Sequence, residues 1–208
     1  MFLAKTPKLL QALMPFYTWC IPASGQALYL TFDDGPIPDV TPWVLDTLRY
    51  YHARATFFCV GDNVQKHPEI FNQILEEGHS VGNHTFHHLN GWQTEHVTYL
   101  HNVRRCARLV KSRLFRPPYG RLMPRQREFL QRHYRIVMWD VLSGDYDMSI
   151  SPEQCLRNVT DHAQPGSIIL MHDSLKAERN LRFVLPAALE YFAGQGYRFE
   201  KLTEETGV

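Results

Sequence analysis

The sequence predicts a single α/β domain whose parallel strands form a barrel. Its 208 residues, 44% of them hydrophobic and 12% aromatic, suffice for one substantial core. Short β-rich runs and helical patterns alternate over the whole length, which is typical of parallel strands joined by crossover helices. Polar residues follow the carboxyl ends of several of these runs, where α/β barrels build their active sites, so we expect a barrel rather than an open sheet.

Seven short apolar or β-rich runs are candidate strands, at residues 28–32, 55–60, 79–82, 114–115, 134–139, 167–171 and 197–199. Helical patterns fill the intervals between them. Thr41-Pro42 is a helix-start signal, and Gly78 is suited to end the next helix. The candidate helices lie at residues 41–48, 70–75, 97–110, 124–133, 151–163 and 180–193.

Residues 1–26 form an N-terminal extension to the predicted catalytic domain, residues 27–208. The extension mixes leucines with lysines and prolines and never sustains an apolar stretch, which predicts neither a signal peptide nor a membrane span. We expect a short amphipathic helix packed on the domain rather than a membrane-surface anchor, because basic residues are few. A cytoplasmic location without stable membrane insertion is the corresponding expectation, with export by an unrecognised route as the alternative.

Charge and cysteine content exclude some classes of protein. The net charge is +1, with 22 basic and 21 acidic residues interspersed, so no nucleic-acid-binding face is expected. The four cysteines are scattered without a Cys-x-x-Cys pair, and three lie in apolar contexts. Free buried thiols are therefore expected.

Two adjacent aspartates, Asp33 and Asp34, end the apolar run that begins at residue 27 and precede Gly35-Pro36. Two carboxylates crowded at the end of a buried strand resist ionising together unless a cation or a hydrogen-bond donor is near. The sequence must therefore supply such a partner elsewhere.

His84 and His88 are candidate partners. They are four residues apart, so a helical segment would project both from one face toward a cation. Asp34 is the natural third ligand of a two-histidine, one-carboxylate site. A histidine pair with this spacing more often consists of ordinary polar residues of the surface or core than of metal ligands. Together with the paired aspartates, however, it favours a metal site. His87 faces another direction and receives no ligand role.

Asp33 is then available as a general base beside the cation. Arg116, in Arg116-Pro117-Pro118, can hold this carboxylate ionised through a forked hydrogen bond, although Arg-Pro-Pro by itself would indicate an exposed turn. His172 follows the buried run 167–171, where a purely structural residue would usually be apolar, so we interpret it as a general acid.

These motifs resemble, in order and spacing, the five motifs of the polysaccharide deacetylases, carbohydrate esterase family 4. The resemblance covers roughly residues 27 to 200. It implies a distorted (β/α)7 barrel, in agreement with the seven candidate strands. The motifs lie at residues 31–36, 84–88, 116–120, 139–146 and 170–172.

The resemblance implies a role for each matching residue. Asp33 is the expected catalytic base, with Arg116 as its tuning partner. Asp34, His84 and His88 are the expected ligands of a divalent metal, usually zinc and sometimes cobalt or nickel.

The remaining implied roles concern the substrate. The backbone N–H of Tyr119 is the expected oxyanion donor, and His172 the expected acid. An N-acetylated amino-sugar oligomer or polymer would lose its acetyl group as acetate and leave a free amine. The groove for the acyl methyl and the sugar would be lined by Trp139, Tyr146 and Leu170.

The fourth motif departs from the family pattern Asp-x-x-Asp-Trp. Leu142 stands where we expect the aspartate that tunes His172, and Tyr146 replaces the tryptophan. Asp140 or Asp145 could supply the missing carboxylate from a neighbouring position. The replaced tryptophan also suggests a substrate pocket unlike that of typical chitin or peptidoglycan enzymes.

Two other classes of function use the same fold. A metal-dependent amidase or deformylase could act on another small or lipid-linked acylated amino compound. A non-catalytic carbohydrate-binding relative would lack the base, the acid or a ligand, whereas this chain retains all of them.

Overall fold

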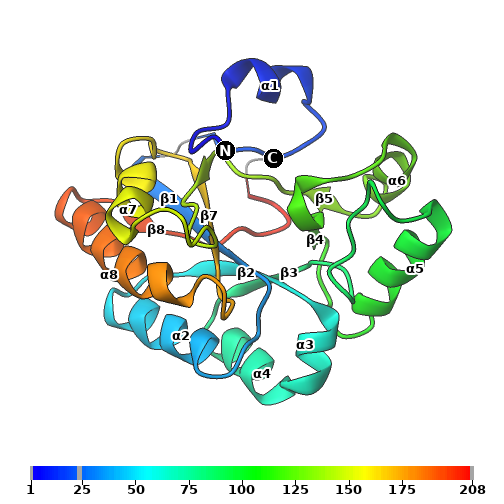
Figure 1. Ribbon diagram of the computed structural model, residues 1–208, viewed down its shortest axis with the longest axis horizontal. Coiled ribbons are helices and arrows are strands. Elements are labelled where there is room, and N and C mark those ends of the chain that lie inside the picture. The colour runs from blue at the N-terminus through cyan, green and yellow to red at the C-terminus, as the bar shows by residue number, and fades with distance from the viewer. Residues whose placement is uncertain (1, 23–24, 207–208) are drawn as a thin grey trace.

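The computed structural model describes residues 2–22 and 25–206 (Figure 1). Its strands are β1 (Ala27–Asp33), β2 (Ala55–Cys59), β3 (Ser80–Asn83), β4 (Leu114–Phe115), β5 (Arg135–Ile136), β6 (Val141–Leu142), β7 (Ile168–His172) and β8 (Arg198–Phe199). Its helices are α1 (Lys8–Leu13), α2 (Val40–Tyr50), α3 (Gly61–Lys66), α4 (Pro68–Glu76), α5 (His96–Cys106), α6 (Pro124–Leu130), α7 (Pro152–Thr160) and α8 (Glu178–Gly194), with a 3-10 turn at Pro118–Gly120.

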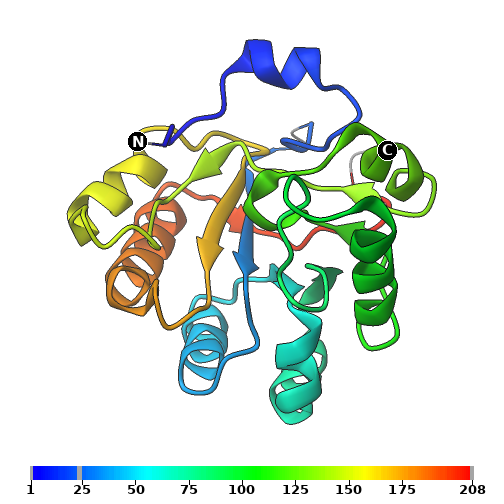
Figure 2. The same cartoon turned by 45° about the vertical axis from the view of Figure 1, so that its right-hand side comes forward.

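The strands pair in parallel in the order β5-β4-β3-β2-β1-β7-β6, and β8 pairs with the start of β1. In Figure 2, β1 and β7 run side by side in the same direction. The order ends at β5 on one side and at β6 on the other, so the sheet does not close on itself and forms a half-barrel with its helices outside. The predicted single-domain α/β barrel is confirmed in this open form. All carboxyl ends meet at one edge.

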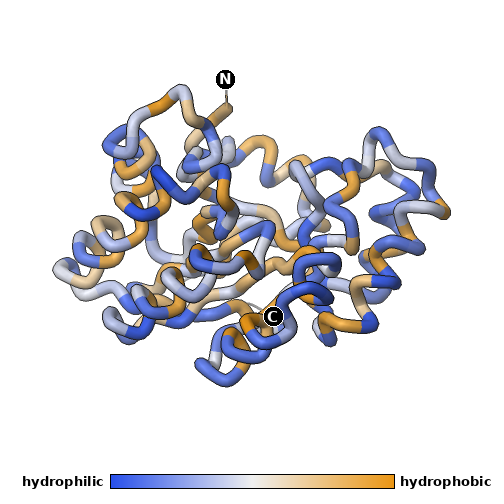
Figure 3. Tube along the Cα trace, turned by 60° about the horizontal axis from the view of Figure 1, so that its bottom comes forward, coloured by the Kyte–Doolittle hydropathy of each residue, from blue (hydrophilic) through white to orange (hydrophobic). Residues whose placement is uncertain are grey.

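Strand β1 is buried along its whole length and separates two apolar clusters. Leu28 and Phe32 face the helices and pack with the cores of α2 and α8, whereas Ala27 and Tyr29 face the barrel interior. This alternation follows from the two-residue period of a strand. Figure 3 shows hydrophobic and hydrophilic residues alternating along the peripheral helices, as expected where one helical face packs on a sheet.

Strand β6 and helix α3 were not predicted from the sequence. Strand β6 has two residues and helix α3 has six, so neither is long enough to show a repeating apolar pattern. The helix expected at 97–110 ends at Cys106, and residues 107–110 form a turn that buries Val110. Three of the cysteines are buried, and Cys20 is exposed.

The N-terminal segment crosses the two ends of the half-barrel. Thr18 pairs with Val137 just after β5, and Lys5 pairs with Val141 in β6. A short helix does form here, as expected, but α1 buries none of its residues, and Figures 1 and 2 show it standing away from the strands. The flanking residues make the backbone bridges, and within α1 the Gln11 side chain donates to Asp140 Oδ1 at 3.0 Å. No helix in the described parts of the chain is both long and apolar enough to cross a bilayer.

Candidate active site

The two aspartates at the end of β1 lie in different surroundings. Asp33 continues the face of β1 that points into the barrel and is 4% exposed. Asp34 follows in a left-handed conformation, with φ of 87°, and its side chain lines the cavity at the mouth of the barrel. The turn therefore separates two carboxylates that are adjacent in sequence.

Arg116 is fully buried against Asp33, so Arg-Pro-Pro is no exposed turn here. Its Nη1 donates to Asp33 Oδ1 at 2.7 Å and to the Thr31 hydroxyl at 2.9 Å. Nε and Nη2 donate to the carbonyls of Val137 and Met138. The predicted fork on Asp33 is therefore replaced by a single bond, and three further bonds from the guanidinium go to neutral oxygens. The buried charge is fully paired, as burial of an ion requires.

Three candidate metal ligands converge at the barrel mouth. Ligand atoms of Asp34, His84 and His88 all lie within 4.8 Å of one another. His88 Nε2 is 3.1 Å from Asp34 Oδ1, and His84 Nε2 is 3.8 Å from the same oxygen. The segment from His84 to His88 is not helical, whereas the four-residue spacing would place both rings on one face only in a helix. Left-handed Thr85 and His88, with φ of 64° and 54°, turn the loop so that both imidazoles face Asp34.

The protonation states suit a divalent cation. Burial lowers the pKa of His84 to about 4, so the ring is neutral at pH 7. Its Nδ1–H donates to the Arg116 carbonyl at 2.8 Å, which leaves the Nε2 lone pair free for a ligand. Burial tends to raise the pKa of Asp34, but the hydrogen bond to His88 and the nearby imidazoles outweigh burial and lower it, so Asp34 is ionised. One anion and imidazole nitrogens form a donor set that fits zinc, cobalt or nickel.

His172, at the end of β7, is held by Asp145. Its Nδ1–H donates to Asp145 Oδ1 at 2.8 Å, and its backbone N–H donates to Oδ2 at 2.7 Å. Burial alone would lower the pKa of His172, but the fully buried Asp145 carboxylate raises it to about 9. Nε2 is left to face the cavity. The structure thus gives His172 a carboxylate partner despite Leu142.

Asp140, the other candidate partner of His172, is directed elsewhere. Its carboxylate binds Lys5 Nζ at 2.5 Å, the Gln11 side-chain amide and the Ser167 hydroxyl. A role in tuning His172 is therefore wrong for Asp140. The cause is chain direction: Asp140 precedes β6 on the side of the N-terminal segment, whereas Asp145 follows β6 at the carboxyl edge.

Sequence reasoning missed the residues that hold the turn after Asp33. The fully buried Asp173 accepts from the Gly35 N–H at 3.0 Å and from the Thr41 hydroxyl at 2.6 Å. Asn63 Nδ2 donates to the Asp34 carbonyl at 2.7 Å. Asp173 directly follows His172 at the end of a strand, and this position in the sequence could have indicated that Asp173 belongs to the site.

The candidate residues share one cavity of about 940 Å³. Arg116 and Asp145 lie behind its wall. In the described residues nothing accepts a hydrogen bond from the Tyr119 N–H, and this residue has φ of 60°. Leu142 contributes an apolar wall at the place where a carboxylate was expected. The predicted residues in the lining are Asp33, Asp34, His84, His88, Tyr119, Trp139, Tyr146, Leu170 and His172.

The half-barrel and this cavity define a single-domain α/β protein with a candidate metal centre. The chain belongs to the polysaccharide deacetylase family, hydrolases of carbon–nitrogen bonds, and residues 21–134 match the description of that family. The family depends on a divalent metal, which agrees with the Asp34, His84 and His88 cluster.

Several characterised proteins are similar to the chain. A peptidoglycan-N-acetylglucosamine deacetylase of Bacillus cereus is 34% identical, over 91% of this chain and 92% of its own length. A chitooligosaccharide deacetylase of Azorhizobium caulinodans is 37% identical, over 74% and 76%. A crystal structure of a peptidoglycan N-acetylglucosamine deacetylase with 4-naphthalen-1-yl-N-oxidanyl-benzamide superposes with a TM-score of 0.86, at 29% identity over 95% of both chains.

Proposed function

We propose that the protein removes N-acetyl groups from the amino sugars of a peptidoglycan-like or chitooligosaccharide substrate, using a divalent cation, with zinc as the first candidate. One observation carries the proposal: a carboxylate fixed by Arg116 and an imidazole fixed by Asp145 face the same cavity as the three candidate ligands. The similarity to deacetylases that act on peptidoglycan and chitooligosaccharides supports the substrate class.

Asp33 acts as the general base. Its Oδ1 accepts from Arg116, so Oδ2, which lies 3.7 Å from His84 Nε2, is the oxygen left to accept a proton from the attacking water. The guanidinium fixes the orientation of the Asp33 carboxylate. The bound cation would supply Lewis-acid polarisation of the acetyl carbonyl and of the water.

Tyr119 and His172 act on the other atoms of the amide. The N–H of Tyr119, for which the described residues offer no acceptor, donates to the oxygen that becomes negative as the tetrahedral intermediate forms. His172, protonated at neutral pH because of Asp145, transfers its Nε2 proton to the departing amine. Cleavage of the carbon–nitrogen bond then yields acetate and the free amino sugar.

The cavity wall suits an acetyl methyl group. Leu142 and Leu170 are buried apolar residues beside His172, and Trp139 and Tyr146 extend the wall toward the mouth. Ring centroids of Tyr146 and His172 are 5.1 Å apart in an edge-to-face arrangement. Such a lining favours a small apolar acyl group with a carbohydrate beyond it.

Acetate release tests the proposal. The zinc-loaded protein should release acetate from N-acetylglucosamine oligomers and from peptidoglycan fragments, and a chelator should abolish the release. Release of formate from N-formylated amino compounds, with no acetate from any glycan, would favour the deformylase alternative. Glycan binding without any hydrolysis would favour the non-catalytic alternative.

A further inference from the structure

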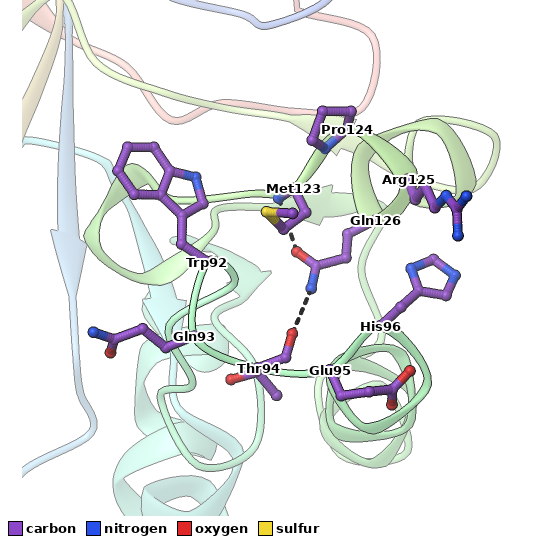
Figure 4. A pocket seen from close by; sticks show the side chains of 9 residues that line it. All are labelled: Trp92, Gln93, Thr94, Glu95, His96, Met123, Pro124, Arg125 and Gln126. Carbon is purple, nitrogen blue, oxygen red and sulfur yellow. Dashed lines mark hydrogen bonds between the residues drawn. The ribbon is translucent and has the colours of Figure 1, made fainter.

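A second cavity, of about 650 Å³, lies next to the loops of the catalytic cavity (Figure 4). One wall is formed by residues 92–96, which follow the loop of His84 and His88. The other wall is formed by residues 123–126, which follow the turn at Tyr119. Among the described residues, the two cavities share no lining residue, but consecutive parts of the same two chain segments line them.

Trp92 is the main apolar group of the second cavity and is 61% exposed. The guanidinium of Arg121 lies 5.1 Å from the centroid of its ring, and Arg121 also lines the catalytic cavity. A tryptophan is normally largely buried, and this exposed ring lies in the lining of a cavity, where a ligand can reach it. Trp92 and Arg121 thus connect the two cavities.

Gly91 allows this connection. A Cβ atom at position 91 would lie 2.4 Å from the Arg121 carbonyl oxygen, so any other residue would push the two segments apart. The tryptophan loop therefore packs directly on the backbone of Arg121.

The loop that carries Trp92 is held in place by Gln126, which is 1% exposed. Its side-chain nitrogen donates to the carbonyls of Gly91 and Thr94, at 3.0 and 3.1 Å, and its oxygen accepts from the Met123 N–H at 2.9 Å. Figure 4 shows Gln126 between the two walls. Because the loop backbone is positioned in advance, little backbone freedom would be lost when a ligand binds to Trp92.

We propose that Trp92 and Arg121 form a distal sugar subsite, which binds a further pyranose ring of the glycan whose acetamido group occupies the catalytic cavity. The inference rests on the proposed function. A β-linked pyranose presents C–H groups on its ring faces, and these pack on the electron-rich face of an indole. The Arg121 guanidinium donates to the hydroxyl groups at the ring edge. The ligand is therefore a glycan longer than the unit that reacts.

Trp92→Ala tests the subsite, with Tyr50→Ala as the matched control. Tyr50 is another exposed aromatic residue, on α2, and lines neither cavity. We expect kcat/KM of the wild type to rise along a series from N-acetylglucosamine disaccharide to hexasaccharide. In Trp92→Ala, the ratio of kcat/KM for the hexasaccharide to kcat/KM for the disaccharide should be about 5- to 10-fold smaller than in the wild type, mainly because KM for the hexasaccharide rises. Trp92→Phe should retain part of the wild-type ratio. Tyr50→Ala should match the wild type.

Electrophoresis in gels containing soluble chitin measures the same subsite without catalysis. The wild type and Tyr50→Ala should be retarded, and Trp92→Ala should be retarded less. Reduced retardation of Trp92→Ala by itself supports the subsite, even where no variant releases acetate and the proposed function fails. Equal retardation of wild type and Trp92→Ala, no retardation of the wild type, or a loss of activity equal for the shortest and longest oligomers overturns the subsite.

Discussion

Asp33 and Asp34 show how one peptide unit can give neighbouring carboxylates different chemistry. Asp33 is buried against Arg116, and Asp34 turns to face His88 because its backbone is left-handed. Their importance could be predicted from position alone, because charges at a buried strand end need partners. Which of the two carboxylates, Asp140 or Asp145, contacts His172 could not be predicted. Both flank a two-residue strand, which is too short to be recognised in the sequence, so its carboxyl end could not be located.

Substitution of each aspartate separates ligand from base. We expect Asp34→Asn to weaken zinc binding by more than about 100-fold, because a ligand matters more than an outer partner. Asp33→Asn should keep zinc affinity within about tenfold while kcat falls by about 10² to 10⁴. Competition with a chromophoric chelator measures the affinity, and acetate release measures turnover. Equal loss of zinc in both variants would show that the two carboxylates do not have separate roles.

The Asp145 carboxylate sets the pH range over which His172 is protonated. Since that charge raises the pKa of His172 to about 9 against the effect of burial, Asp145→Asn should lower it. The alkaline limb of the kcat/KM profile should move about 1 to 3 pH units toward lower pH. Asp140→Asn is the control, because its carboxylate faces Lys5, and it should leave the limb in place. An unmoved limb in Asp145→Asn would contradict this coupling.

At the scale of elements, the site depends on turns rather than on the ends of regular helices. Asp33 points inward because it continues the face of β1 that carries Ala27 and Tyr29, and strand periodicity is local. The His84 to His88 loop behaves differently. Helical spacing suggested a shared face, but two left-handed residues achieve the convergence. Such dihedrals leave little trace in side-chain periodicity, and Thr85 is an unusual residue for that conformation.

Asp173 and Thr41 are expected to hold the Asp33–Asp34 turn through the Gly35 N–H. Thr41→Val removes the hydroxyl that donates to Asp173 and leaves a buried oxygen short of a donor. We expect zinc affinity to fall by about 10- to 100-fold, as for other outer partners of a metal site. Thr41→Ser keeps the hydroxyl and should restore most of the affinity. If Val and Ser variants bind zinc alike in the chelator assay, the hydroxyl does not position the turn.

At the scale of the whole molecule, the half-barrel is open between β5 and β6, and the N-terminal segment spans that interval. Backbone bridges join Thr18 to Val137 and Lys5 to Val141. The Thr6 N–H also donates to the Asp140 carbonyl, at 2.8 Å. Alternation of strands and helices predicts the class of fold but not this arrangement, because a segment without strand periodicity contributes single bridges rather than a strand.

The Lys5–Asp140 ion pair is expected to stabilise this junction. Asp140 is 2% exposed, so loss of the Lys5 ammonium leaves a buried carboxylate with only neutral partners, Gln11 and Ser167. Lys5→Met should lower the free energy of unfolding by about 1 to 3 kcal/mol. Lys8→Met, on the exposed helix α1, removes an equal charge and should change stability by less than about 0.5 kcal/mol. Urea unfolding at neutral pH compares the two. If both variants lose the same stability, general charge rather than the junction is responsible. If neither loses any, the segment binds the half-barrel through its backbone bridges alone.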